Sequence, residues 1–457
     1  MTPPRVVIAG AGSGVGKTVI ATGLMSRLSH RRRVQGYKVG PDFIDPMYHA
    51  AATGRPSRNL DSFFMDRDKL VHLFGWSSKD ADLAVVEGVR GLYDGLTATG
   101  DTGSTAEIAK FIRAPVVLVV NARSLAKSAA AHVLGFKMLD PEVDIAGVIL
   151  NNVSGDRHRQ KAVEAVESLT GTEVLGTIER QRERLPERHL GLITMDEAGD
   201  AGKLMAQLEE LVADVDLDRL EEIARSAPHL EAETTPPFEV REDRGVTFAV
   251  PRDRSFCFYY QENIEALAAA GARVVTFRPT DGERLPDCDA LYMGGGYPEV
   301  HAAALEANSD FREGAKQLSA EGGLVYGECG GMMAMCRSIN AFGEMHDMAG
   351  IFDAQATLTR DRQGLAYVRA KGTEDNFLFP GMEIRAHEFH YSRLEPLPPG
   401  PYGFAVLRGT GIGGAMDGIM VRRSMGTYMH QHALANLSWG PSLVRAAGER
   451  PESGLQT

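Results

Sequence analysis

The stretch Arg5-Val-Val-Ile-Ala-Gly-Ala-Gly-Ser-Gly-Val-Gly-Lys-Thr18 decides the fold of the first half of the chain. Its apolar start, 5–10, predicts a buried strand, and 19–30 predicts a helix. A glycine-rich loop between a strand and a helix, closing on Gly-Lys-Thr, is typical of a P-loop. The strict pattern has glycine at position 11, where this chain has Ala11 between two glycines. A plain glycine turn is the alternative interpretation.

The residue types of this loop fit a bound nucleoside triphosphate. Gly12, Gly14 and Gly16 would let backbone N–H groups turn toward phosphate oxygens. Lys17 would reach the β- and γ-phosphates, and the Thr18 hydroxyl would ligate Mg²⁺. The sequence therefore predicts ATP and Mg²⁺ as cofactors.

The rest of the chain predicts two α/β units. Apolar strand-like runs that alternate with helix-like stretches indicate parallel sheets. In the first half these runs are 82–87, 115–121 and 145–151; in the second half they are 246–250, 273–277, 289–293 and 323–327. Many charges and the pair Pro236-Pro237 mark a linker. We expect domains at 1–214 and 245–450 with a linker at 215–244.

The composition excludes some classes of protein. The 457 residues include 61 acidic and 49 basic side chains, a net charge of −12, which argues against nucleic acid as the partner. No apolar run approaches the roughly 18 residues of a membrane span, and the N-terminus lacks a signal-peptide core. Four cysteines without a CxxC pair favour neither a disulfide framework nor a zinc site. We expect a cytoplasmic protein with no membrane partner.

Polar residues follow the predicted strands of the first half. Glu87 ends one strand and could hold Mg²⁺, with a solvated acid as the alternative. Asn151 and Asn152 end another and could read a purine edge, with turn-forming asparagines as the alternative. Lys38 to Asp45 and Glu87 to Gly95 are further polar loops at this ligand-binding edge, or plain turns.

Cys329 is the candidate nucleophile of the second half. It lies between a predicted strand and a helix, among glycines, as in a nucleophile elbow. A helix N-terminus is expected to lower the thiol pKa, and backbone N–H groups of Gly295 and Gly296 would form an oxyanion hole. The base would be His430 or His432. His387 and His390 are expected to be structural or interface residues.

These motifs together resemble the cobyrinic acid a,c-diamide synthase family. The resemblance covers nearly the whole chain. It rests on the P-loop and on strings such as Lys38-Val-Gly-Pro-Asp-Phe-Ile-Asp-Pro46, Gly327-Glu-Cys-Gly-Gly331 and His387-Glu-Phe-His-Tyr-Ser392. It implies a dethiobiotin-synthetase-like P-loop domain followed by a class I glutamine amidotransferase domain.

The resemblance also implies a reaction. Cys329 would release ammonia from L-glutamine, and the P-loop domain would activate the a and c acetate carboxylates of a tetrapyrrole as acyl phosphates. Lys38, Asp42, Asp45 and Asp94 match positions that handle the macrocycle and the intermediate, and Asp45 would join Thr18 and Glu87 as a Mg²⁺ ligand. A homodimer is the oligomeric state that the family favours.

The motifs leave open the identity of the base, the macrocycle and the class of enzyme. Class I amidotransferases have His-x-Glu at the base, whereas this chain has His432 in the acidic position, so the base is His430 or His432. Cobyrinic acid is the expected substrate, and Ni-sirohydrochlorin and hydrogenobyrinic acid share the same motifs. A cobyric-acid-synthase-like enzyme, a positioning-type P-loop ATPase and a binding protein with an inactive second half are the remaining alternatives.

Overall fold

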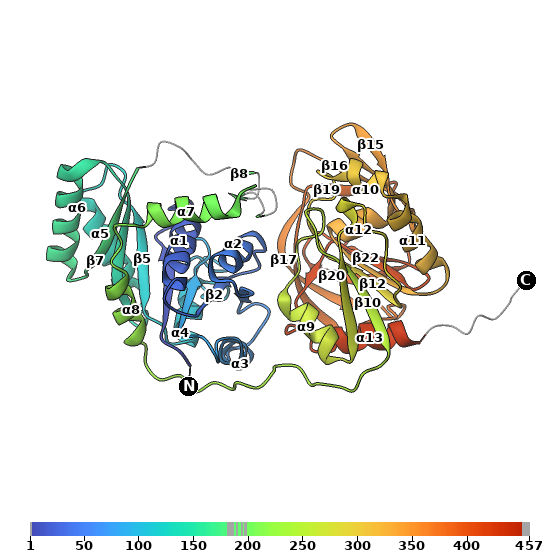
Figure 1. Cartoon of the computed structure of the whole chain (residues 1–457), viewed down its shortest axis with the longest axis horizontal. Coiled ribbons are helices and arrows are strands. Elements are labelled where there is room, and N and C mark those ends of the chain that lie inside the picture. Colours follow the sequence, from blue (N-terminus) through green and yellow to red (C-terminus); the bar gives the residue numbers. More distant parts are fainter. Residues whose placement is uncertain (1, 181–186, 189–190, 193–194, 196–198, 450–457) are drawn as a thin grey trace, which may run out of the picture. The chain divides into compact units, whose positions relative to one another are not determined.

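The computed structural model describes residues 2–180, 187–188, 191–192, 195 and 199–449. The chain divides into two compact units, Met1–Pro237 and Phe238–Thr457. Each unit has a main sheet of its own (Figure 1). Position 450, the expected end of the second domain, lies outside the described residues.

The first unit is built on a seven-stranded sheet in the order β3-β2-β4-β1-β5-β6-β7, with every neighbouring pair parallel. The strands are β1 (Arg5–Gly10), β2 (Val34–Val39), β3 (Arg58–Leu60), β4 (Leu83–Glu87), β5 (Val116–Asn121), β6 (Ile145–Val153) and β7 (Val174–Glu179). Every residue of β1 and β4 is buried, so both faces of the sheet are covered. The predicted α/β class with a parallel sheet is confirmed.

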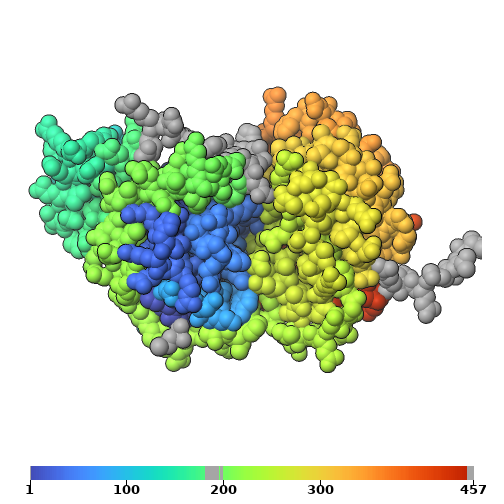
Figure 2. Space-filling view, in the orientation of Figure 1, coloured from blue at the N-terminus to red at the C-terminus, as the bar shows by residue number. Residues whose placement is uncertain are grey.

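Helices cover this sheet. They are α1 (Lys17–Ser29), α2 (Ile44–Thr53), α3 (Arg67–Ser77), α4 (Thr105–Phe111), α5 (Lys127–Leu139), α6 (Gly155–Thr170), α7 (Ala201–Leu211) and α8 (Leu217–Arg225); β8 (Glu187–Arg188) and β9 (Gly191–Leu192) form a separate hairpin. The blue helix α1 lies beside the green helix α7 (Figures 1 and 2). Gly23 permits this approach, because a Cβ there would lie 2.3 Å from the Leu208 carbonyl oxygen.

The segment 215–244 differs from the expected linker in its first part. Residues Leu217–Arg225 form α8, which the Asp216 side chain caps by accepting from the Arg219 N–H at 2.9 Å. Leu220, Ile223 and Ala224 lie on one buried face, at the i, i+3, i+4 spacing of an amphipathic helix. The many charges in this segment therefore mark the exposed face of a helix, and the irregular chain begins after it.

The second unit has a ten-stranded mixed sheet in the order β11-β10-β12-β13-β22-β21-β20-β17-β18-β23. The first five strands of this order run parallel, and antiparallel pairing begins between β22 and β21. The strands are β10 (Val246–Pro251), β11 (Ala272–Phe277), β12 (Ala290–Met293), β13 (Leu324–Glu328), β17 (Gly364–Gly372), β18 (Glu383–His390), β20 (Tyr402–Arg408), β21 (Met416–Val421), β22 (Ser424–Thr427) and β23 (His430–Gln431).

This unit also contains a second, four-stranded sheet and several α-helices (Figure 1). The small sheet contains β14 (Cys336–Ala341), β15 (Glu344–Asp347), β16 (Phe352–Leu358) and β19 (Ser392–Glu395). The helices are α9 (Gln261–Ala269), α10 (Ala302–Ala307), α11 (Ser309–Ala320), α12 (Gly330–Met335) and α13 (Trp439–Gly448), with a 3₁₀ turn, η1 (Pro279–Asp281). Within the described residues, no helix combines the length and apolar character needed to cross a lipid bilayer.

Candidate active sites

The P-loop between β1 and α1 has the backbone conformation that glycine permits. Gly14 and Gly16 have φ values of 72° and 94°, in the left-handed region. A Cβ on Gly16 would lie 2.5 Å from the Asn151 side-chain nitrogen. In the part of the chain that the structure describes, the backbone N–H groups of residues 12–16 make no hydrogen bond to protein. Such a row of donors at a helix N-terminus fits a phosphate group.

Lys17 lies over this loop with its charge held by backbone oxygens. Its Nζ donates to the Gly12 carbonyl at 3.2 Å and to the Arg90 carbonyl. Burial and then the nearby Lys38 charge lower the pKa of Lys17 to about 8, against the opposing effect of Glu87. Phosphate oxygens would offer this ammonium stronger, charged acceptors than the two carbonyls.

A buried cluster of charges lies next to the P-loop at the ends of β2 and β4. Lys38 Nζ is 2.5 Å from Asp45 Oδ2 and 2.8 Å from Glu87 Oε1. Burial disfavours the Lys38 charge, but the carboxylates of Asp45 and Glu87 outweigh it and raise the pKa of Lys38. Burial and the neighbouring Asp42 charge raise the pKa of Asp45. Because burying charges costs free energy, a cluster of this kind is better explained by chemistry than by stability.

Glu87 is the centre of the cluster. His49, to which no motif assigns a role, is one of its partners. Glu87 Oε1 accepts from the Thr18 hydroxyl at 2.7 Å, and Glu87 Oε2 is 2.6 Å from His49 Nε2. Burial opposes the Glu87 charge, but Lys38 and His49 outweigh it and lower the pKa of Glu87. His49 lies on α2 and is fully buried, so only the folded structure shows that it reaches β4.

The predicted Mg²⁺ ligands provide oxygen donors only. A hydroxyl from Thr18 and carboxylates from Asp45 and Glu87 are the ligand types that Mg²⁺ takes. Lys38 lies between the two carboxylates in this structure. Among the described residues, no group of three His, Cys, Asp or Glu side chains is arranged to hold a metal ion. The donor chemistry thus fits Mg²⁺ bound mainly through phosphates and the Thr18 hydroxyl, with few protein ligands.

Asp42 and Asp94 shape the two polar loops beside the cluster. Asp42 Oδ1 accepts from the N–H groups of Ile44 and Asp45, at 2.7 and 3.0 Å, and so begins α2. Asp94 Oδ2 accepts from the Gly91 N–H at 3.0 Å. The second loop is tied to the P-loop, because the Leu92 N–H donates to the Gly10 carbonyl at 2.8 Å.

Asn151 and Asn152 make contacts inside the protein. Asn151 Nδ2 donates to the Val15 carbonyl of the P-loop at 2.8 Å, and Asn151 Oδ1 accepts from the Asn152 N–H at 2.8 Å. Asn152 Nδ2 donates to Asn121 Oδ1 at 3.1 Å. These contacts fix the end of β6 against the phosphate loop. A role in reading the purine stays a prediction.

Cys329 occupies a strained turn between β13 and α12. Its φ of 47° lies in the left-handed region, which costs a residue with a side chain free energy and is typical of a nucleophile elbow. The Cys329 N–H donates to the Thr427 carbonyl of β22 at 2.7 Å. Its Sγ is 3.9 Å from the Phe389 carbonyl of β18. The turn holds the thiol where these strands meet.

The expected lowering of the Cys329 pKa is wrong for this structure. Burial, followed by the charge of Glu299, raises the pKa of the thiol, although the Gly330 N–H favours the thiolate. The short helix α12 cannot offset the loss of hydration. The Cys329 thiol is therefore neutral in this structure, and as a nucleophile it would need a base.

The loop 294–299 lies between this turn and His430. A Cβ on Gly295 would be 2.5 Å from His430 Cε1, and a Cβ on Gly330 would be 3.1 Å from the Gly296 nitrogen. Only glycine fits at these close approaches. Within the described chain, the Gly296 N–H donates to no protein acceptor. It is therefore a better placed candidate oxyanion donor than the more enclosed Gly295.

The two candidate bases have different surroundings. His430 Nδ1 is 3.8 Å from Glu328 Oε2, and its ring lies against the glycine loop. His432 Nε2 is 3.6 Å from Glu262 Oε2, and its Nδ1 accepts from the Leu434 N–H at 3.2 Å. His432 thus pairs with α9 and with its own turn. His430 is thus the candidate base that contacts the glycine loop next to the cysteine turn.

His387 and His390 flank this site on β18. His387 lies opposite His430 in the β18–β23 register, and the two rings stack at 4.9 Å. Burial and then the His430 charge lower the pKa of His387 well below 6.5, so His387 is neutral. His390 stacks on Tyr428 at 3.6 Å. Both histidines are packed inside the second unit.

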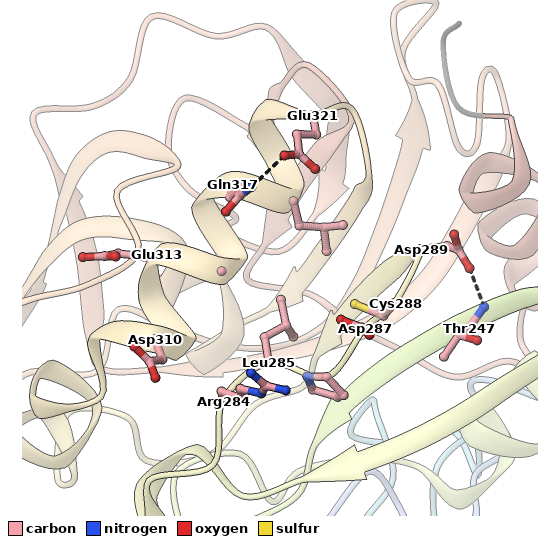
Figure 3. Close-up of a pocket in the computed structure, with 13 residues that line it drawn as sticks. Thr247, Arg284, Leu285, Asp287, Cys288, Asp289, Asp310, Glu313, Gln317 and Glu321 are labelled. Carbon is pink, nitrogen blue, oxygen red and sulfur yellow. Dashed lines mark hydrogen bonds between the residues drawn. The ribbon is translucent and has the colours of Figure 1, made fainter. Parts of the chain in front are cut away.

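A surface cavity of about 800 Å³ in the second unit lies apart from this chemistry (Figure 3). Its lining includes Thr247 near the start of β10, Asp289 directly before β12, and Asp310 and Glu313 of α11. Cys329 follows the opposite, carboxyl end of β13. The cavity therefore lies at the opposite end of the strands from Cys329, and its size does not indicate the glutamine site.

Comparisons with known proteins match both halves of the chain. Residues 6–193 match the model of the CobQ/CobB/MinD/ParA nucleotide binding domain, and residues 247–437 match that of the CobB/CobQ-like glutamine amidotransferase domain. The cobyrinate a,c-diamide synthase of Methanothermobacter thermautotrophicus is 47% identical over 97% of this chain and 100% of the relative. The chain belongs to the cobyrinate a,c-diamide synthase family. The family predicted from the motifs is confirmed.

Other members of the family extend the comparison. Those of Methanosphaera stadtmanae and Archaeoglobus fulgidus are 43% and 42% identical, over 97% and 98% of this chain and 99% and 98% of the relatives. Among solved structures, PurLQS of Thermotoga maritima matches with a TM-score of 0.34 and 12% identity, covering 44% of this chain and 97% of that chain. That similarity is too low to support a conclusion. Family membership makes the chain a glutamine-hydrolysing ligase with a nucleotide-binding domain.

Proposed function

We propose that this protein uses ATP and L-glutamine to convert the a and c acetate carboxylates of cobyrinic acid to amides. One observation supports this most strongly: a single chain contains both a P-loop with a buried acidic cluster and a strained cysteine turn whose neighbouring glycine loop also contacts His430. Neither site alone requires the other. Together they match an enzyme that makes ammonia at one site and consumes it at the other.

In the second unit, Cys329 would attack the carboxamide carbon of glutamine. His430 would take the thiol proton and return it to the leaving nitrogen, so that the C–N bond breaks and ammonia departs. The N–H groups of Gly296 and Gly330 would stabilise the oxyanion. Water would then hydrolyse the glutamyl thioester to glutamate and restore the thiol.

In the first unit, a substrate carboxylate would attack the γ-phosphorus of ATP and release ADP. Lys17 and the backbone N–H groups of residues 12–16 would hold the phosphates. Ammonia would then attack the acyl phosphate, and inorganic phosphate would leave. Lys38, Asp42, Asp45 and Asp94 are proposed to position the macrocycle carboxylate and the intermediate, and Asn151 and Asn152 to border the nucleotide.

Mg²⁺ is part of the proposal. Thr18, with Glu87 and Asp45 close to it, would hold the ion, which would neutralise phosphate charge when bound. We also propose a homodimer, on the family resemblance, and a cytoplasmic location.

Product mass spectrometry tests the proposed reaction. The protein would be incubated with MgATP and glutamine and, in separate reactions, with cobyrinic acid, hydrogenobyrinic acid or Ni-sirohydrochlorin. We expect a diamide from cobyrinic acid. A diamide from Ni-sirohydrochlorin or hydrogenobyrinic acid alone would move the substrate to that macrocycle. ATP hydrolysis without any amide would contradict the synthase and favour a positioning-type ATPase.

A further inference from the structure

Glu328 is a buried carboxylate that the reaction described above leaves unused. It is the last residue of β13, directly before Cys329, and only 1% of its surface is exposed. Its strand is otherwise Leu-Val-Tyr-Gly, without a charge. A buried carboxylate is costly unless several donors satisfy it. The groups that contact the Glu328 carboxylate therefore indicate its role.

The partners of Glu328 include both residues of β23, the strand that carries His430. Glu328 Oε1 accepts from the Gln431 backbone N–H at 3.2 Å and from the Tyr326 hydroxyl at 3.2 Å. Glu328 Oε2 accepts from the Tyr292 hydroxyl at 3.3 Å and lies 3.8 Å from His430 Nδ1. Glu328 thus holds β23 through its backbone and lies near Nδ1 of the His430 imidazole.

The frame around Glu328 is rigid. Trp439 packs edge-on against Tyr292, with ring centroids at 5.3 Å, and against Tyr326, at 6.1 Å. Asn263 of α9 donates to the Gln431 carbonyl at 2.8 Å and accepts from the Ala433 N–H at 2.8 Å. Aromatic packing and backbone hydrogen bonds therefore fix the carboxylate and the histidine strand relative to each other.

We propose that Glu328 is the acidic member of the glutaminase triad, as the positioning residue for His430. It replaces the acid that class I enzymes carry two residues after the histidine, where this chain has His432. A carboxylate facing Nδ1 favours the tautomer with the proton on Nδ1, which leaves Nε2 to take the Cys329 proton. It also stabilises the imidazolium that then forms. The Nδ1 to carboxylate distance is expected to shorten when glutamine binds, as catalytic hydrogen bonds do.

The second histidine-glutamate pair of this region supplies a matched control. Glu262 is 0% exposed and lies 3.6 Å from His432 Nε2, so it closely matches Glu328 in burial and in distance to a histidine. A role that was only structural would make Glu262→Gln and Glu328→Gln similarly harmful. A positioning role makes only Glu328→Gln harmful to glutamine hydrolysis.

The test compares Glu328→Gln, Glu328→Asp and Glu262→Gln in the full chain, and it rests on the proposed function. We expect Glu328→Gln to lower kcat for glutamine hydrolysis about 100-fold, with KM within about two-fold and ammonia-supported amidation unchanged. Glu328→Asp keeps the charge and should recover about ten-fold of the loss. Glu262→Gln should stay within about three-fold of the unmodified protein.

Three outcomes would overturn the inference. They are a Glu328→Gln kcat within about three-fold of the unmodified protein, an equal loss in Glu262→Gln, and loss of folded structure in both Glu328 variants. Absence of glutamine hydrolysis in the unmodified protein would instead contradict the proposed function, so the two failures can be told apart.

Discussion

The P-loop site and the thiol site use the same architecture with opposite electrostatics. Each lies where a buried parallel strand ends in a glycine-containing turn and a helix begins. The first site keeps charges in place on Lys38 and Glu87, because their contact raises the pKa of Lys38 and lowers the pKa of Glu87. The second keeps a neutral thiol, because burial raises the pKa of Cys329. Phosphate binding requires fixed charges, whereas a thiol nucleophile can stay neutral until a base takes its proton.

Cys329→Ala gives the largest effect that this comparison predicts. Glutamine-dependent amidation should fall by more than about 10⁴-fold, because no other group can form the thioester. Ammonium salts should restore amide formation, because the charged site of the first unit is untouched. Rates measured with glutamine and with ammonium check this. A variant that keeps its glutamine-dependent rate would remove Cys329 from the reaction.

Lys17→Met tests the P-loop site. The rate should fall by about 10³-fold with glutamine and with ammonium alike, because the phosphates lose a fixed charge that either nitrogen source requires. Binding of a fluorescent ATP analogue and amidation rates would measure this. Arg31→Met, a change on the exposed side of the same unit, is the control and should behave like the unmodified protein. Rescue of Lys17→Met by ammonium would contradict the assignment.

His49→Ala tests whether the charged cluster depends on the His49 imidazole, which contacts Glu87 from α2. Removing the imidazole leaves Glu87 Oε2 without its contact at 2.6 Å, in a fully buried position. We expect the free energy of unfolding of the first unit to fall by about 3 kcal/mol. Urea denaturation would measure it, with the exposed His132→Ala as control. Equal stability of His49→Ala and the unmodified protein would mean that the contact does not support the cluster.

Asp417 gives the smallest effect, and it concerns pH. Burial raises the pKa of Asp417 from 3.8 to about 6, against three hydrogen bonds that favour the charge. The folded state therefore binds the proton more tightly than the unfolded state. The contribution of Asp417 to stability is complete below pH 3.8 and is lost as the pH rises through about 6.

Asp417→Asn should remove this dependence on pH. Relative to the unmodified protein, the variant should gain about 2 kcal/mol of stability between about pH 4 and pH 7.5. Thermal unfolding across that range would measure it. A constant difference between the two proteins at every pH would contradict the raised pKa.

The sequence predicted most of the fold because the decisive signals are local. The apolar runs at 5–10, 82–87 and 145–151 correspond to β1, β4 and β6. Glu87 and Asn151 lie toward the carboxyl ends of β4 and β6, and Lys17 begins the helix that follows the turn after β1. Parallel strands bring these ends to one edge. The helix α8 was missed because its charges were interpreted as a linker, although Leu220, Ile223 and Ala224 have helical spacing.

The contacts between distant segments could not be predicted in the same way. His49 reaches Glu87 only after α2 has packed on the sheet, and His387 reaches His430 only through the β18–β23 pairing. Glu328 had a local signal: it is an acid at the end of an otherwise uncharged strand. The same signal identified Glu87. The Cys329 pKa was misjudged because a helix N-terminus is visible in a sequence and burial is not.

The most direct test of the central claim follows the nitrogen atom. The unmodified protein would be given MgATP, cobyrinic acid and glutamine labelled with ¹⁵N in the side-chain amide, and the product would be analysed by mass spectrometry. The account predicts a diamide with ¹⁵N in both new amide groups and no amide when ATP is omitted. A product without ¹⁵N, or labelled ammonia released without any amide on the macrocycle, would contradict the claim that this chain joins the two reactions.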